Sequence, residues 1–351
     1  MNHTPVLFRA ASLLALATIA ACADSPVAPR ETPSSPSLAA TSTGADEIAM
    51  VSPRLGDLNA SLARANANVR IAKAELLMSA GWNGKSATVI FANDRVRGNG
   101  AEWVKGDPLR DGRLGVTYQI APELGVRPAV LNPDRATARL ATFAELAQRT
   151  EEAMSAWRDR TCSDAPIVQV PVPPNTDPTL LDELIKGLPV SANYAQTADI
   201  VHGGWQSQQF FRNIAVLLNE PPSAGDAIIG ITFTFTYIDE NGDATDIDRN
   251  RKQDTGLAEV YYNARFVWDN SALFDLRVVD FYSIIAHESG HALGLGHLGK
   301  LFITAPDARD GLQVADLKYA PKALMNAAYL AGRDGIAGLD NSAFCQIWSG
   351  N

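Results

Sequence analysis

Three of the five histidines in this chain lie within eleven residues, and Glu288 directly follows the first of them. Residues four apart on a helix lie on the same face, so His287 and His291 can reach one metal ion. The glycines that follow His291 allow the helix to end and the chain to turn, which would bring in His297 as a third ligand. Glu288 lies one step round the helix, beside a metal-bound water rather than on the metal. The spacing predicts a three-histidine metal centre with an adjacent carboxylate.

Three neutral nitrogen ligands with an open fourth position are typical of catalytic zinc rather than structural zinc. Zinc lowers the pKa of its bound water towards about 7, and a carboxylate base completes the activation. We therefore expect zinc on His287, His291 and His297. Glu288 is expected to take a proton from the zinc-bound water as it attacks a scissile carbonyl, and to deliver it to the leaving amine.

The run from His287 to His297 resembles the HExxHxxGxxH signature of the metzincin metalloproteases. The resemblance implies an α+β zincin catalytic domain with a twisted mixed sheet, an active-site helix, a Met-turn and a C-terminal helix. In that family the methionine of the Met-turn lies beneath the metal. Met325 follows His297 by 28 residues and fits this role, with an ordinary core methionine as the alternative.

Among metzincins the chain most resembles the matrixins. Tyr329 follows Met325 by four residues, as in the matrixin pattern whose tyrosine lines the specificity pocket. Asn326 and Ala327 depart from that pattern, and Ala327 also stands where astacins and serralysins carry a tyrosine ligand. His202 is expected to be a structural or substrate-cleft residue rather than a ligand of a second zinc. Residues 45–113 contain no cysteine that could plug the zinc, so any latency would need another group.

Periodicity predicts the elements that position these residues. Helices are expected at 57–80, 141–159 and 275–286, and residues 339–348 resemble the closing helix of matrixin catalytic domains. Strands are expected at 86–97, 114–120, 167–172, 228–238 and 258–268. Residues 105–113 are rich in turn formers and predict a boundary. The division that follows is an N-terminal helical segment at 45–113, a candidate prosegment, and a matrixin-like metalloprotease domain at 114–351.

The first 44 residues predict export and anchoring. Residues 1–21 have the basic start and short apolar run of a signal peptide, too short to span a bilayer as a helix. They end in Ile-Ala-Ala before Cys22, which resembles the lipobox of bacterial lipoproteins; an ordinary secretory signal is the alternative. Residues 22–44 carry the lipidated Cys22 and a proline- and serine-rich tether expected to be disordered. We expect an exported lipoprotein in the periplasm, outer membrane or cell surface, held to the membrane through its lipid alone.

Two secondary features concern stability. Cys162 and Cys345 are the cysteines that remain after lipidation, and in an exported protein they are expected to pair, with two buried thiols as the alternative. Asp246, Asp248, Asn250 and Asp254 have the alternating spacing of a calcium loop, with a solvated hairpin tip as the alternative.

Composition and these motifs together bound the function. The chain is 46% hydrophobic and 20% charged, as in globular proteins, and its net charge of −9 argues against nucleic acid as a partner. The prediction is a zinc endopeptidase that acts on extracytoplasmic proteins or peptides. The alternatives are a surface-anchored binding or assembly protein on a metzincin scaffold, and a zinc hydrolase of cell-wall amide bonds. The oligomeric state stays open.

Overall fold

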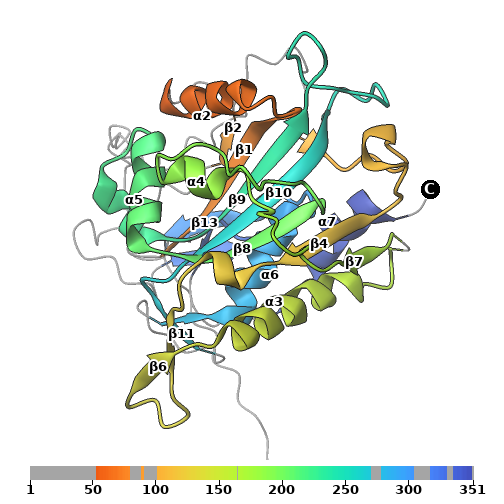
Figure 1. Cartoon of the computed structure of the whole chain (residues 1–351). Coiled ribbons are helices and arrows are strands. Elements are labelled where there is room, and N and C mark those ends of the chain that lie inside the picture. Colours follow the sequence, from red (N-terminus) through yellow and green to blue (C-terminus); the bar gives the residue numbers. More distant parts are fainter. Residues whose placement is uncertain are drawn as a thin grey trace, which may run out of the picture. The chain divides into compact units, whose positions relative to one another are not determined.

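The computed structural model describes residues 53–79, 88–90, 101–163, 165–269, 278–303, 317–329 and 335–349. All of these residues belong to one compact unit. They form a mixed sheet with helices around it, which confirms the α+β class (Figure 1). The predicted signal peptide, the lipidation site at Cys22 and the tether lie outside the described residues. None of the helices in the described ranges is long and apolar enough to cross a membrane.

The main sheet has the strand order β15-β1-β9-β10-β8-β4-β7. These strands are β15 (Ala328–Tyr329), β1 (Val69–Ser79), β9 (Ile228–Tyr237), β10 (Gln253–Asn263), β8 (Ile200–Gln206), β4 (Val116–Ile120) and β7 (Ile167–Gln169). In addition, β2 (Thr88–Ile90) pairs with β1, and β3 (Ala101–Glu102) pairs with β10. Strand β9 runs antiparallel to both of its neighbours, whereas β10, β8, β4 and β7 run parallel to one another.

Helices cover both faces of this sheet and bury two apolar clusters. The first cluster lies under α3 (Phe143–Arg158), α6 (Phe281–Ala292) and α7 (Gly338–Trp348). The second lies under α2 (Pro53–Arg64), α4 (Leu181–Ile185) and α5 (Gln208–Leu217) (Figure 1). Strand β9 shows how the sequence supports two buried faces. Its isoleucines and phenylalanines at 231, 233 and 235 enter the second cluster, and threonines alternate with them on the other face.

Shorter elements complete the described chain. A second sheet has the order β12-β11-β5-β6, and β13 pairs with β14. Their bounds are β5 (Ala129–Leu131), β6 (Ala138–Leu140), β11 (Val267–Asp269), β12 (Val278–Asp280), β13 (Lys300–Ile303) and β14 (Leu317–Ala320). Single 3-10 turns lie at Pro108–Arg110, Pro122–Leu124 and Pro222–Ala227.

The predicted helix over 57–80 is wrong in its second half. Helix α2 ends at Arg64, Asn66 adopts a left-handed conformation with φ of 55°, and the chain continues as β1. The apolar spacing alone fits a helix, because a strand buried on both faces is apolar at nearly every position and so also matches a stripe spaced by threes and fours. Ala74, Leu76 and Met78 alternate into one apolar cluster, and the backbone pairs with β9. These tertiary contacts favour a strand over a helix.

The structure gives no domain boundary at residues 113 and 114. Strand β1, from the N-terminal side of that predicted boundary, lies inside the main sheet. The turn-rich stretch before residue 114 is fixed by a buried ion pair, in which Arg110 Nε lies 3.1 Å from Asp199 Oδ1 at the start of β8. Asp199 also accepts the backbone N–H of Thr117 in β4. Turn-forming residues therefore mark a tightly held bend here, not a linker.

Most of the remaining predicted elements appear with shifted ends. The predicted strand over 258–268 is two strands, β10 and β11, separated by a turn. The predicted helix over 275–286 begins only at Phe281, because Asp280 caps it by accepting the backbone N–H of Ser283. Strand β8 and helix α5 were not predicted. In β8, the pair Gly203 and Gly204 interrupts the alternation of the strand.

Candidate metal centre

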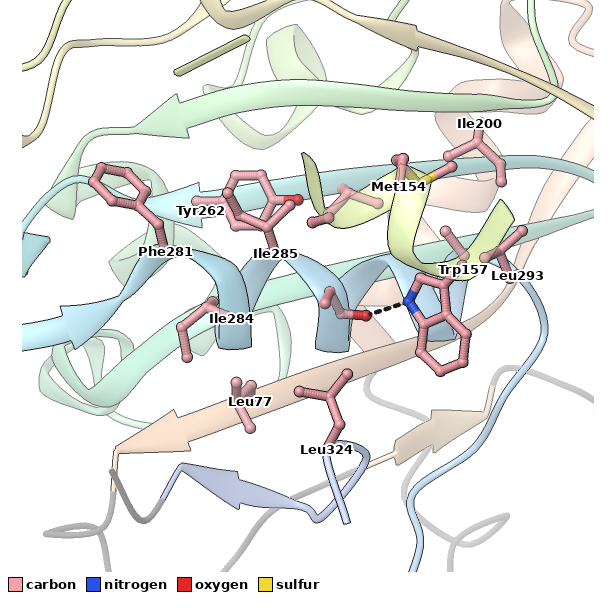
Figure 2. Close-up of a cluster of buried hydrophobic side chains, with 14 of the residues drawn as sticks. Leu77, Met154, Trp157, Ile200, Tyr262, Phe281, Ile284, Ile285, Leu293 and Leu324 are labelled. Carbon is pink, nitrogen blue, oxygen red and sulfur yellow. Dashed lines mark hydrogen bonds between the residues drawn. The ribbon is translucent and has the colours of Figure 1, made fainter. Parts of the chain in front are cut away.

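Helix α6 carries the first two histidines of the motif, and three tryptophans hold it in place. Trp157 Nε1 donates to the carbonyl of Ala286 at 2.8 Å (Figure 2). Trp103 donates to the carbonyl of Ala292, and Trp348 donates to that of Leu293 just beyond the helix. The last two carbonyls belong to the helix end, where no backbone partner is available. Indoles from three distant segments thus fix the position of α6.

The side chains of His287, His291 and His297 converge on one point. His291 Nε2 lies 3.0 Å from His287 Nε2 and 3.2 Å from His297 Nε2. His297 reaches this point because the chain turns at Gly294, which has a φ of 96°. His287 and His291 are buried. The structure therefore brings together the three residues that the sequence predicts as ligands.

Backbone contacts fix which ring nitrogens face inwards. His287 Nδ1 lies 2.8 Å from the carbonyl oxygen of Leu324, and His291 Nδ1 lies 2.8 Å from that of Leu295. A carbonyl oxygen only accepts hydrogen bonds, so each Nδ1 donates and each neutral ring presents a bare Nε2. Tetrahedral zinc with Zn–N bonds near 2.05 Å needs its nitrogens about 3.3 Å apart. The three histidines could hold a metal ion, and their donor set suits zinc.

Glu288 lies on the same helix, fully buried, against β9. Its Oε2 lies 2.6 Å from the hydroxyl oxygen of Thr232. Gly230, two residues earlier on β9, makes room for it: a Cβ there would lie 2.7 Å from Glu288 Oε1. Sequence reasoning missed both β9 residues, although a glycine inside a β-branched strand signals a close approach of another group.

Met325 lies against the site helix in a turn that other segments fix. A Cβ at Gly290 would lie 2.4 Å from Met325 Sδ, so the glycine between the two histidines of α6 admits the thioether. Asp340 in α7 accepts the backbone N–H groups of Leu324 and Met325. The backbone N–H of Leu298 donates to the carbonyl of Met325. The turn is thereby tied to both the third histidine's segment and the C-terminal helix.

The predicted pocket tyrosine and the histidine outside the motif are both buried. The Tyr329 hydroxyl accepts the backbone N–H of Asp280 at 3.1 Å, which ties β15 to the start of α6. His202 Nδ1 lies 2.9 Å from the hydroxyl oxygen of Tyr262, and burial lowers the pKa of His202 to about 3. His202 is therefore a neutral core residue.

A buried ion pair on β1 lies beside the centre and was not predicted. Glu75 Oε2 lies 2.9 Å from Lys73 Nζ and 3.1 Å from His291 Nδ1. Burial by itself would raise the pKa of Glu75, but the contacts with His291 and Lys73 outweigh it and hold the pKa well below its ordinary value. Lys73 and Glu75, within the buried part of a largely apolar strand, were the sequence signal, which the helical interpretation of 57–80 obscured.

The candidate calcium loop brings its carboxylates together. Ligand atoms of Asp246, Asp248 and Asp254 all lie within 4.8 Å of one another, close enough to share a cation. The fourth predicted ligand, Asn250, makes a different contact: its Oδ1 accepts the backbone N–H of Lys252. Calcium here stays a prediction.

Cys162 and Cys345 form a disulfide, as predicted, with their Cα atoms 5.5 Å apart. It joins the chain just after α3 to α7. Such bonds persist mainly in oxidising compartments.

Comparison with protein-family models gives no match for this chain, and a search of curated proteins gives none either.

Proposed function

We propose that this chain is an exported zinc endopeptidase of metzincin type, with matrixin-like features, anchored by a lipid on Cys22. The convergence of three histidine Nε2 atoms next to a buried glutamate carries this proposal. The positions of Met325 beneath α6 and of the closing helix α7 also support it.

The contacts assign a chemical role to each group of the site. Zinc held by His287, His291 and His297 would supply a Lewis acid that polarises a scissile carbonyl and acidifies water. Glu288 is the general base and then the acid, since it lies one helical step from His287 and is held by Thr232. Its carboxylate would accept a proton from the attacking water and return it to the leaving amine. Backbone carbonyls keep the histidine rings oriented.

A second candidate is a binding or assembly protein built on the same scaffold. One observation favours it: β9, the strand that contacts Glu288, has strand partners on both sides, so an incoming peptide finds no free edge. The test below separates the two, and it also detects hydrolysis of a cell-wall amide bond.

The test compares the natural chain with Glu288→Gln. Both proteins are loaded with zinc, their metal content is measured, and each digests a peptide library and a peptidoglycan sample that are read by mass spectrometry. We expect one zinc per chain in both, and peptide products from the natural chain alone, reduced at least 100-fold in the variant. Equal cleavage by Glu288→Gln would refute the mechanism. Zinc without cleavage of any peptide, before or after the opening treatment described below, would favour the binding protein.

A further inference from the structure

Strand β1 pairs along one edge of β9, the strand that contacts Glu288. This pairing has a regulatory consequence, which rests on the proposed peptidase function. β1 pairs antiparallel with β9 from Val69 opposite Tyr237 to Met78 opposite Ile228. Its last residues pair in parallel with β15, just after the Met325 turn. Without β1, the edge of β9 would be open, and an open edge next to a catalytic site is where an extended peptide adds as a strand.

The register places two β1 side chains on the face of the sheet that packs against α6. Glu75 stands opposite Thr232, and Leu77 stands opposite Gly230. Directly opposite residues of an antiparallel pair point to the same face, so both side chains face α6, as Thr232 does towards Glu288. Leu77 is fully buried in the first apolar cluster, near Ile284 and Leu324 (Figure 2). Glu75 contacts His291.

The two faces of β1 differ in chemistry. Ala74, Leu76 and Met78 enter the second apolar cluster, as expected for a core strand. The opposite face carries the buried pair Lys73 and Glu75. Burying an ion pair contributes little to stability compared with apolar residues of the same size, so its retention needs a different explanation. The contact of Glu75 with the outward-facing Nδ1 of His291, beside the three-histidine centre, provides one.

Helix α2, β1 and β2 lie in one run of chain that precedes all of the candidate ligands and Glu288 in the sequence. From residue 101 onwards the chain is fixed to the framework that carries the site, through pairing of β3 with β10 and the bond from Trp103 to Ala292. The metal ligands, Glu288, Met325 and the three tryptophans that hold α6 all lie after this point. The boundary between regulatory and catalytic parts thus falls between β2 and β3.

We propose that residues 53–90 are a built-in inhibitory segment: β1 occupies the edge of β9 where a peptide would add as a strand, with Leu77 opposite Gly230 and Glu75 against the outer side of His291. The folded chain is then latent, and displacement of this segment opens the site. The inhibitory element is a strand that fills the peptide-binding edge, in place of a cysteine that binds the metal.

The main experiment uses the full chain, loaded with zinc, with a recognition sequence for a specific protease placed within residues 91–100. The cut chain and the uncut chain are compared by release of the segment on gel filtration, zinc content, affinity for a peptide hydroxamate and rate on a fluorogenic peptide. We expect release of the segment, unchanged zinc, and at least a tenfold gain in both affinity and rate. Equal hydroxamate affinity before and after release would overturn the proposal. Loss of zinc on release would also overturn it, because β1 would then be a structural strand or Glu75 a permanent support of His291.

Point variants test the same idea without a cut. Leu77→Ala should raise the rate and the hydroxamate affinity of the uncut chain at least tenfold, because it weakens the segment over the site. Leu181→Ala is the matched control: it removes the same atoms from a fully buried position in α4, outside the segment. Equal gains in both variants would indicate general loosening and would overturn the proposal.

The outcomes also separate this inference from the proposed function. Tighter hydroxamate binding after release, with no peptide hydrolysed, would retain the inhibitory segment and refute the peptidase. Peptide hydrolysis at the same rate before and after release would retain the peptidase and refute the inhibitory segment.

Discussion

Hydrogen bonds to backbone carbonyls set the chemistry of the individual site residues. The carbonyls of Leu324 and Leu295 fix the orientation of two imidazoles, and Thr232 holds the glutamate. His202 shows the contrasting case. It is equally buried, but its Nδ1 contacts the hydroxyl of Tyr262 and its burial lowers its pKa, so it is a core residue and not a ligand.

Burial of His202 predicts a loss of stability in acid. Its pKa falls from about 6.5 in the unfolded chain to about 3 in the folded chain, so the unfolded state binds the extra proton between these values. The stabilisation is present above pH 6.5 and is lost as the pH falls towards 3, by roughly 1 kcal/mol per pH unit. Urea unfolding of the natural chain and His202→Gln at pH 7.5 and 5 measures this. The variant should lose less stability between the two pH values, and an identical loss in both proteins would contradict the assignment.

At the scale of elements, glycines decide how closely α6 can approach its neighbours. Gly230 on β9 admits Glu288, and Gly290 on α6 admits Met325. A Cβ at either position would lie within 3 Å of its neighbour. Strand β9 can therefore approach α6 because it lacks a side chain at residue 230, and the Met325 turn can approach α6 because the helix lacks one at residue 290.

Gly290→Ala tests this packing. Alanine in a helix interior is intrinsically favoured by about 1 kcal/mol, yet its Cβ would displace Met325. We expect a net loss of roughly 1–3 kcal/mol in the free energy of unfolding. The double variant, Gly290→Ala with Met325→Ala, should lose less free energy of unfolding than the sum of the two single-variant losses, by at least about 0.5 kcal/mol.

Gly338→Ala is the control for this prediction, since a Cβ at Gly338 at the start of α7 meets nothing within 4 Å. It should leave stability unchanged or raise it. A stabilising Gly290→Ala would show that Met325 moves aside freely and would contradict the tight packing.

At the scale of the whole molecule, the disulfide and α7 bind distant parts of the chain to the site. The bond from Cys162 to Cys345 closes a sequence separation of 183 residues. Asp340 on the same helix holds the Met325 turn, and Trp348 holds the end of α6. The C-terminal helix therefore connects the bridge to the metal centre.

Removal of this disulfide should destabilise the protein strongly. Closing so long a loop restricts the unfolded chain by about 5 kcal/mol in the chain-entropy treatment. Cys162→Ser with Cys345→Ser should lower the midpoint of thermal unfolding by roughly 10 °C or more. The natural chain under reducing conditions is the companion measurement, and it should behave like the double variant. An unchanged midpoint in either would contradict a stabilising role for the bridge.

The sequence by itself determined the features that depend on local spacing or on scarcity. The ligand set follows from histidines four and ten residues apart with Glu288 between them, and the disulfide follows from having only two candidate cysteines in the folded part. Strands such as β9 and helices such as α3 follow from their own apolar periodicity.

Only the tertiary structure decided what β1 is and what it faces. Its apolar residues fit a helix as well as a strand, and the choice depended on an open edge of β9, about 150 residues further along the chain. The contacts of Glu75 with His291, of Gly230 with Glu288 and of Gly290 with Met325 have the same origin. Strand pairing and close packing join residues that are distant in sequence, so no local pattern encodes which group a buried side chain meets.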